Sequence, residues 1–173
     1  MLLNISYNDK EVKRKIEKTV GKPFSLQKRW KIGGIGSPKL LIDSCSLDIS
    51  NLLILDQNID KCNIELRPKG IIVHFRSLLE TYGLIIPYYK LKIYKGKAKI
   101  YSIYMDNYFI KVISDNDSVR KFFKKIANQK ILNTPLIFYH NLQLQNKLSR
   151  KHNLLISKFY HRNEVLLKLF FWT

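Results

Sequence analysis

The residues in this sequence best suited to chemistry are cations that alternate with apolar residues along two short segments. His74 and Arg76 alternate in GIIVHFR, and Lys90 and Lys92 alternate in LIIPYYKLKIY. In extended strands such alternation places the polar side chains on one face. Cations interleaved with aromatic rings suit phosphate groups, on lipid headgroups or on a nucleic-acid backbone. A solvated face in a Lys-rich protein has the same pattern, so the sequence leaves both interpretations open.

Further cations extend this candidate basic face. Arg67 and Lys69 lie at the turn before His74, and Tyr88 and Tyr94 share the alternation of Lys90. A basic helix farther along the chain adds three lysines if it presents the same side. The candidate anion-binding residues are therefore Arg67, Lys69, Arg76, Lys90, Lys92, Lys121, Lys124 and Lys125.

Other binding motifs are incomplete. KIGGIGSPK lacks the Gly-Lys-Ser/Thr ending of a P-loop, and Lys39 stands where a dinucleotide fingerprint has its third glycine, so we expect a connector. DQNIDKCNIELR begins like a calcium loop. However, Lys61 replaces the turn glycine and Arg67 replaces the bidentate acid, which argues against calcium.

Catalytic and metal-binding signatures are also missing. His74 has no Cys or His at ligand spacing, and His140, His152 and His161 are too widely spaced for one helical face to gather them. The sequence has no nucleophile elbow, Cys-His signature or paired-carboxylate motif. We therefore expect a protein that is not an enzyme and has no cofactor and no metal site.

The composition is strongly basic. The chain has 173 residues with 31 Lys and Arg against 13 Asp and Glu, a net charge of +18. This length allows one domain plus extensions. The charge favours phosphate-bearing partners, although an AT-rich genome also produces Lys-rich and Asn-rich proteins, and the sequence does not separate these causes.

The cysteines and the termini bear on location. Cys45 and Cys62 are too few for a disulfide framework, so we expect them to be reduced. No apolar run reaches the roughly 18 residues of a membrane span, and no signal-peptide pattern occurs at the start. We expect a cytoplasmic protein, with peripheral attachment to a membrane as an open alternative.

The N-terminal part predicts one helix followed by a linker. YNDKEVKRKIEKTVGKP has Asn8 as N-cap with Glu11 as capping-box partner, and Gly21 and Pro23 end the helix. Its apolar stripe is narrow, which indicates a helix on the surface of the main body. Glycines then predict a loop over residues 32–39.

Seven strands are predicted next, without an intervening helix, so the sheet should be an antiparallel meander. They span residues 39–47, 51–56, 62–67, 70–76, 82–94, 97–105 and 108–113. Turn residues predict hairpins at Arg67–Gly70, Lys95-Gly96 and Asp106-Asn107. The residues predicted to face inward are Ile64, Leu66, Ile71, Val73, Phe75, Ile85, Tyr89, Leu91 and Ile93; those predicted to face outward are Glu65, Arg67, His74, Arg76, Lys90 and Lys92.

An amphipathic helix should close the sheet. SDNDSVRKFFKKIANQ begins with the capping residues Ser114 to Asp117 and places Val119, Phe122, Phe123 and Ile126 on one face. The predicted organisation is an N-terminal helix and linker (1–38), a β domain with its closing helix (39–132) and a basic, partly apolar extension (133–173). The extension is either helical or poorly ordered, and its end, NEVLLKLFFWT, has the character of a docking or interfacial helix.

Seven meandering strands followed by one amphipathic helix resemble the pleckstrin-homology-like (PH-like) domains of bacteria, over residues 39–129. A strand that opens on glycine, KGIIVHFR, and an apolar strand with Pro-Tyr-Tyr, LIIPYYKLKIYKGK, carry the local likeness. The resemblance implies a bent, nearly orthogonal pair of sheets capped by the helix, and a binding role. The first hairpin, LDISN, lacks the cations of lipid-binding relatives, and the tryptophan of the closing helix is replaced by Phe122 and Phe123.

The leading expectation is a PH-like binding module for an anionic membrane surface or a protein partner. The first alternative is a nucleic-acid-binding protein that uses the basic and aromatic sheet face. The second is a structural or interaction protein whose apolar tail docks on a partner or on a second copy of the chain. The sequence leaves the oligomeric state open.

Overall fold

The computed structural model describes residues 1–55, 60–96, 99–114 and 116–133, and Met1–Asn133 forms one compact unit. Beyond Asn133, the predicted extension over residues 133–173 lies outside these described residues. The strands are β1 (Leu2–Asn4), β2 (Leu40–Cys45), β3 (Lys61–Arg67), β4 (Gly70–Ser77), β5 (Glu80–Pro87), β6 (Lys92–Lys95), β7 (Ile100–Met105) and β8 (Tyr108–Ile113). The helices are α1 (Lys10–Val20), α2 (Leu26–Lys31), α3 (Leu47–Leu53) and α4 (Asp117–Asn133).

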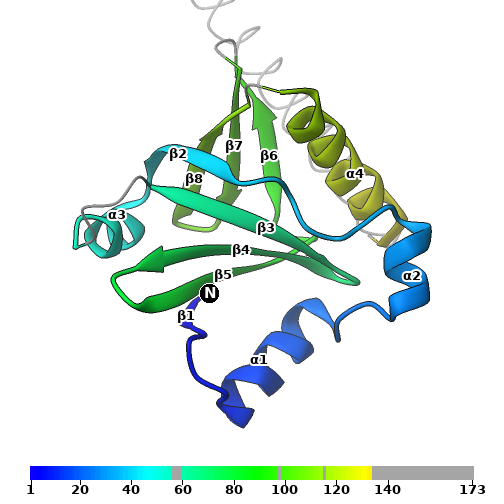
Figure 1. Ribbon diagram of the computed structural model, residues 1–173, viewed down its shortest axis with the longest axis horizontal. Coiled ribbons are helices and arrows are strands. Elements are labelled where there is room, and N and C mark those ends of the chain that lie inside the picture. The colour runs from blue at the N-terminus through cyan, green and yellow to red at the C-terminus, as the bar shows by residue number, and fades with distance from the viewer. Residues whose placement is uncertain (56–59, 97–98, 115, 134–173) are drawn as a thin grey trace, which may run out of the picture. The chain divides into compact units, whose positions relative to one another are not determined.

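The eight strands form one antiparallel sheet in the order β1-β5-β4-β3-β2-β8-β7-β6. Strand β2 belongs to both halves, because Leu40 and Leu41 pair with β3 whereas Ile42 to Cys45 pair with β8. The register shifts between Ile42 and Ser44, and such a bulge bends a strand. The first half, β1 to β5, and the second half, β6 to β8, consequently run in different directions (Figure 1). The expected class, mainly antiparallel β with helices, is confirmed.

Five predicted strands correspond to β2, β3, β4, β7 and β8, and all three predicted hairpins form. The prediction of a strand over residues 51–56 is wrong, because α3 continues through Leu53 and a turn follows it at residues 54–55. Ile49 and Leu53, one helical turn apart, are its buried residues. A short apolar run fits a strand or one face of a helix, and the chain here follows the helical spacing.

The predicted strand over residues 82–94 is two strands. Strand β5 ends at Pro87, and the backbone N–H groups of Lys90 and Leu91 donate to the Pro87 carbonyl in a turn. This turn interrupts the strand alternation of inward and outward side chains. Tyr88 is therefore buried and Tyr89 is 58% exposed, the reverse of the predicted orientation. Strand β1 was missed because its three residues are recognisable only by their pairing with β5.

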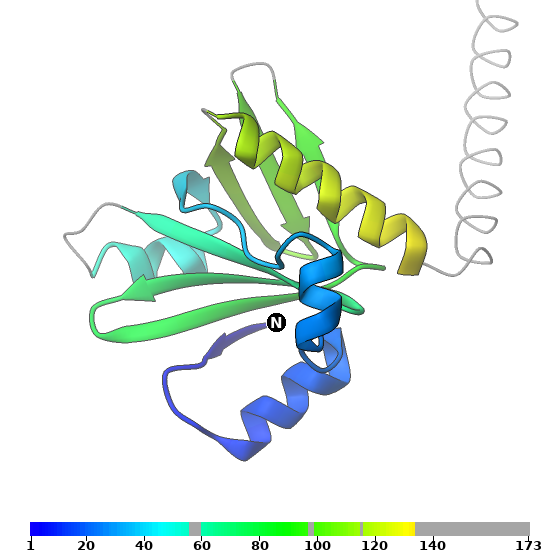
Figure 2. The ribbon, with the colours of Figure 1, turned by 45° about the vertical axis from the view of Figure 1, so that its right-hand side comes forward.

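The main core lies between the inner faces of the sheet halves and α4. The predicted inward residues of β3 and β4 are buried there, with Leu84 and Ile86 from β5. Helix α4 contributes Val119, Phe122, Phe123 and Ile126, as predicted, and the Phe123 ring stacks on Tyr101 with centroids 4.0 Å apart. In two views α4 lies beside the second half and α1 beside the first (Figures 1 and 2).

A second, smaller core lies on the outer face of the first half. Ile85, predicted to face inward, instead packs here with Ile72 and Val20 of α1. Gly70 makes the close approach possible, because a Cβ there would lie 2.3 Å from the Ile86 carbonyl oxygen and 2.6 Å from Val20. Helix α1 begins after Asp9, one residue later than predicted, and Gly21 ends it with a φ of 85°.

The position of Cys62 on the inner face of β3 gives a chemical test of this register. Its side chain is 2% exposed, and burial raises the pKa of the thiol to about 12. In the native protein we expect an alkylating reagent at pH 8 to label the partly exposed Cys45 and to spare Cys62 until denaturant is added, because the thiolate is the reactive form. A Cys45→Ser variant isolates the Cys62 signal, and rapid labelling of that variant under native conditions would contradict the register.

Candidate anion-binding site

The outer face of the β3–β4 hairpin is divided between a covered and an open part. Alternation places Lys61, Asn63, Glu65 and Arg67 of β3 on this face, in the register that pairs Asn63 with His74 and Arg67 with Gly70. Helix α1 covers the part near Ile72. The part toward the tip of the β4–β5 hairpin remains open to solvent.

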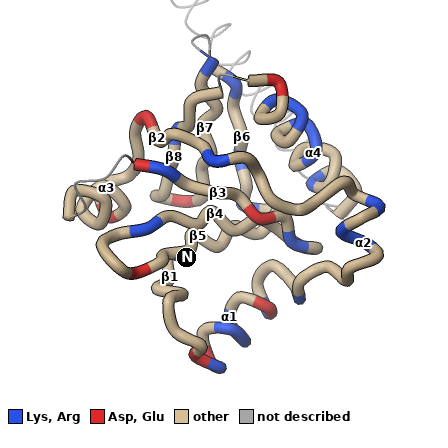
Figure 3. The backbone as a smooth tube through the Cα atoms, in the orientation of Figure 1, with Lys and Arg blue, Asp and Glu red and all other residues tan. Residues whose placement is uncertain are grey.

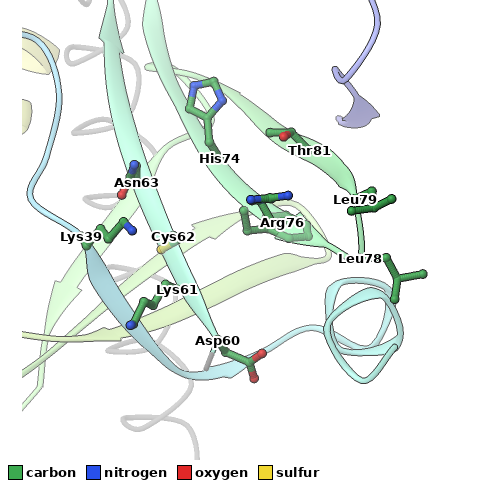
Figure 4. Close-up of a pocket in the computed structure, with 11 residues that line it drawn as sticks. Lys39, Asp60, Lys61, Cys62, Asn63, His74, Arg76, Leu78, Leu79 and Thr81 are labelled. Carbon is green, nitrogen blue, oxygen red and sulfur yellow. The ribbon is translucent and has the colours of Figure 1, made fainter. Parts of the chain in front are cut away.

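The open part holds a hollow of about 660 Å³, which we call the basic hollow. Its polar side chains come from the residues just before β2 and β3, from the first half of β3, from the second half of β4 and from β5: Lys39, Asp60, Lys61, Asn63, His74, Arg76 and Thr81. Leu78 and Leu79, at the tip of the β4–β5 hairpin, lie on its rim (Figure 4).

The cations of the basic hollow are exposed and close to one another. Within the described residues, Lys39, Lys61 and Arg76 make no ion pair, and Asp60 is the only carboxylate among the lining side chains. Continuing the register beyond Cys62 and Phe75 sets Lys61 opposite Arg76. Like charges at directly opposed positions destabilise a sheet, and a bound anion would remove that repulsion.

The leucines on the rim are unusual for a hairpin tip. Leu78 is 56% and Leu79 is 89% exposed, and Leu78 has a φ of 55°, a conformation that Gly or Asn normally adopts in a two-residue turn. The hairpin is held against α3 because the Ser77 hydroxyl donates to the Leu52 carbonyl. The tip therefore presents two apolar side chains beside three cations.

Glu65 organises the adjoining part of the same face. One carboxyl oxygen lies 2.8 Å from Arg67 Nε and the other 3.2 Å from His74 Nε2. Burial by itself raises the pKa of this carboxyl, but the hydrogen bond with His74 and the charge of Arg67 outweigh it and hold the pKa below its ordinary value. Arg67, a predicted anion-binding residue, is thus already paired.

The structure does not bring the remaining predicted cations to the basic hollow. Lys69 lies in the β3–β4 turn, about 20 Å along the strands from Lys61. Lys90 and Lys92 line a separate hollow beside β6 and β7. Lys121 and Lys124 are exposed on α4, and the Lys125 ammonium donates to the Gly33 and Gly34 carbonyls. Of the eight predicted residues, Arg76 alone lines the basic hollow.

Sequence reasoning missed Lys39, Lys61, Leu78 and Leu79. Lys61 shares the outward alternation of Glu65 and Arg67, so starting the predicted strand one residue earlier would have included it. The leucines gave no turn signal, since SLLE lacks the Gly, Asn or Pro that marks most hairpins. Lys and Arg occur on most elements, so charge alone does not single out this site (Figure 3).

Neither related proteins nor other types of site in the described residues indicate a function. No family model, curated protein or solved structure matches the chain. Within the described ranges, no group of three or more His, Cys, Asp or Glu side chains is arranged to hold a metal ion. No described helix is long and apolar enough to cross a membrane.

The Glu65 network predicts a specific pH dependence. Glu65→Gln should lower the free energy of unfolding at pH 7 by about 2 kcal/mol, because Arg67, with a side chain 13% exposed, loses its counter-charge. Since the folded pKa lies below 4.5, the wild-type contribution is complete above that pH and is lost as the pH falls through the lowered pKa. Urea unfolding between pH 7 and 3 should therefore show a difference that shrinks with acid.

Glu11 is exposed, so Glu11→Gln is the matched control, and we expect it to lower the free energy of unfolding by about 0.3 kcal/mol. A Glu65→Gln difference that stayed constant down to pH 3 would refute the assigned role of this carboxylate.

Proposed function

We propose that this chain is a PH-like module that acts by binding rather than by catalysis. Three features support the proposal: two bent sheet halves that share β2, an uninterrupted meander from β6 to β8, and a helix that follows the last strand and packs on the core. Phe123 fills a packing position on that helix where the resemblance leads us to expect tryptophan. The edge strand β1 and the helix α3 are additions to the implied pattern.

The ligand that fits best is an anionic membrane surface. The observation that carries this proposal is the basic hollow, where three cations lie beside two exposed leucines. Phosphate groups complement the cations, and each Lys or Arg near an anionic surface contributes about 1 kcal/mol. The leucines favour a lipid surface over a free phosphate, because apolar side chains gain free energy only where an apolar phase is available.

The residues assigned to this site come from its geometry and not from the family. Lys39, Lys61 and Arg76 hold the phosphates, and Leu78 and Leu79 enter the boundary between headgroups and acyl chains. Helix α3 supports the hairpin tip through the Ser77 to Leu52 hydrogen bond. Lys121 and Lys124 lie on α4, which is on the opposite side of the molecule from α3 in Figure 1, and take no part.

Charge reversal in the basic hollow should strongly weaken membrane binding. With Lys61→Glu and Arg76→Glu combined, we expect the partition onto vesicles containing phosphatidylserine to fall at least thirtyfold, because losing two cations alone removes about 2 kcal/mol. Flotation at low and moderate salt measures this partition. Neutral vesicles should not float the wild-type protein.

The matched control is Lys121→Glu with Lys124→Glu, which changes the net charge equally. We expect it to retain most of the binding, with only a small long-range loss that disappears at moderate salt. Equal losses in both double variants would refute a localised site. Absence of flotation by the wild-type protein would refute the membrane assignment and direct attention to a protein partner.

The hairpin tip permits a variant in which stability and binding move in opposite directions. Leu78→Gly should raise the free energy of unfolding by about 1 kcal/mol, because Gly adopts a φ of 55° without strain. Combined with Leu79→Ser, it should nevertheless weaken vesicle binding roughly tenfold or more, since two apolar side chains are lost. Thermal unfolding and flotation report the two effects, and unchanged flotation would remove the leucines from the proposal.

A further inference from the structure

The outer face of the second sheet half carries a different surface, which the proposed membrane site does not use. Alternation places Ile93, Ile103, Met105 and Ile110 in or against the core. The opposite face therefore presents Lys92 and Tyr94 of β6, Tyr104 of β7, and Phe109 and Lys111 of β8, in the register that pairs Lys92 with Tyr104 and Tyr104 with Phe109.

Three aromatic rings form a continuous row across these strands. The Tyr94 and Tyr104 centroids lie 5.7 Å apart in an edge-to-face arrangement, and the Tyr104 and Phe109 centroids lie 5.8 Å apart. Tyr94 is 59% exposed, and Tyr89, in the turn before β6, adds a fourth ring. With Lys90, Lys92 and Asp106, the tyrosines line a hollow of about 510 Å³, which we call the aromatic hollow.

Cations flank the row of rings on both sides. Lys92 is exposed and lies close enough to Lys130 for its charge to contribute, after burial, to a lowered pKa of that lysine. The Lys111 ammonium lies 5.7 Å from the centre of the Phe109 ring. Lys90 is paired with Asp106 at 2.8 Å, and that hydrogen bond raises the pKa of the lysine. Lys92 is thus the cation best placed to meet a phosphate, while Asp106 opposes one.

We propose that this face binds a single-stranded nucleic acid. Exposed rings on a sheet stack with bases, and nearby cations contact the phosphates, a combination that tolerates many sequences. A lipid surface fits less well, because the exposed rings carry hydroxyl groups and none of the described residues that line the aromatic hollow is aliphatic. A proline-rich peptide also stacks on tyrosines, but it gives no role to Lys92 and Lys111.

The rings and the cations make different contributions to this binding. Tyr94 and Tyr104, the most central rings, stack on successive bases, and Tyr89 extends the platform at one end. Lys92 contacts a phosphate on the side of β6. Asp106 lowers affinity both by its own charge and by holding Lys90. The site does not depend on the basic hollow, so its failure and the failure of the membrane proposal are independent.

The salt dependence of binding distinguishes the contribution of the rings from that of the cations. Fluorescence anisotropy with a labelled oligo(U) of about ten nucleotides measures affinity across a series of salt concentrations. For Lys92→Gln we expect the slope of log K against log salt to decrease in magnitude by about 0.7, the change for one lost contact on a single strand. For Tyr94→Leu we expect the slope to stay unchanged while affinity falls between about fivefold and a hundredfold.

Three further variants control for folding and for net charge. Tyr94→Phe keeps the ring and should retain binding, whereas a general disturbance of β6 would weaken it as well. Asp106→Asn should raise affinity. Lys121→Gln changes the net charge as much as Lys92→Gln but lies on α4, outside both hollows, so it should leave the slope nearly unchanged.

Several results would overturn the proposal. They are no binding of oligo(U) at low salt, equal effects of Lys92→Gln and Lys121→Gln, or a Tyr94→Leu variant that binds like the wild type. Displacement of oligo(U) by a neutral proline-rich peptide, together with unchanged binding in Lys92→Gln, would assign the face to peptide recognition instead.

Discussion

The fold depends on the double pairing of β2. This strand of six residues forms hydrogen bonds with β3 through its first two positions and with β8 through the remainder. If β2 paired with only one neighbour, the two sheet halves would each expose an apolar inner face that neither can bury alone. The bulge between Ile42 and Ser44 bends the sheet, and the bend creates the space that α4 fills with Phe122 and Phe123.

The sequence predicted buried residues best where the local pattern of apolar residues matches the face that packs into the core. Alternation in β3 and β4 and the helical spacing of Val119, Phe122, Phe123 and Ile126 correctly predicted nine residues of the main core, because one face of each of these elements packs into it. The pattern failed for β5, where Leu84, Ile85 and Ile86 are all buried. Helix α1 covers the outer face of that strand, and no local signal in β5 reports a helix that lies more than sixty residues earlier in the chain.

The sequence predicted which types of residue face solvent at the candidate site, but not where in the fold the site lies. Alternation correctly indicated that Arg76 and Lys92 face solvent, yet it could not show that they lie on different sheet halves. Alternation also could not show which cations are already paired with other groups of the protein. Arg67 is paired with Glu65, Lys90 with Asp106, and Lys125 with two carbonyl groups of the glycine loop. The pairings of Lys90 and Lys125 join segments distant in sequence, and all three pairings make these cations less available to a ligand.

The contact between Gly70 and Val20 sets a limit on how the chain can be shortened. Strand β1 pairs with β5, and α1 covers Ile72 and Ile85, so the first 38 residues contribute structure to the sheet itself. A fragment that began at Lys39 would expose the edge of β5 and this apolar patch together. Exposed strand edges beside apolar surface promote association between copies, so such a fragment would be more prone to aggregate than the longer chain. The boundary suggested by the PH-like resemblance is therefore not a boundary at which this polypeptide can be cut.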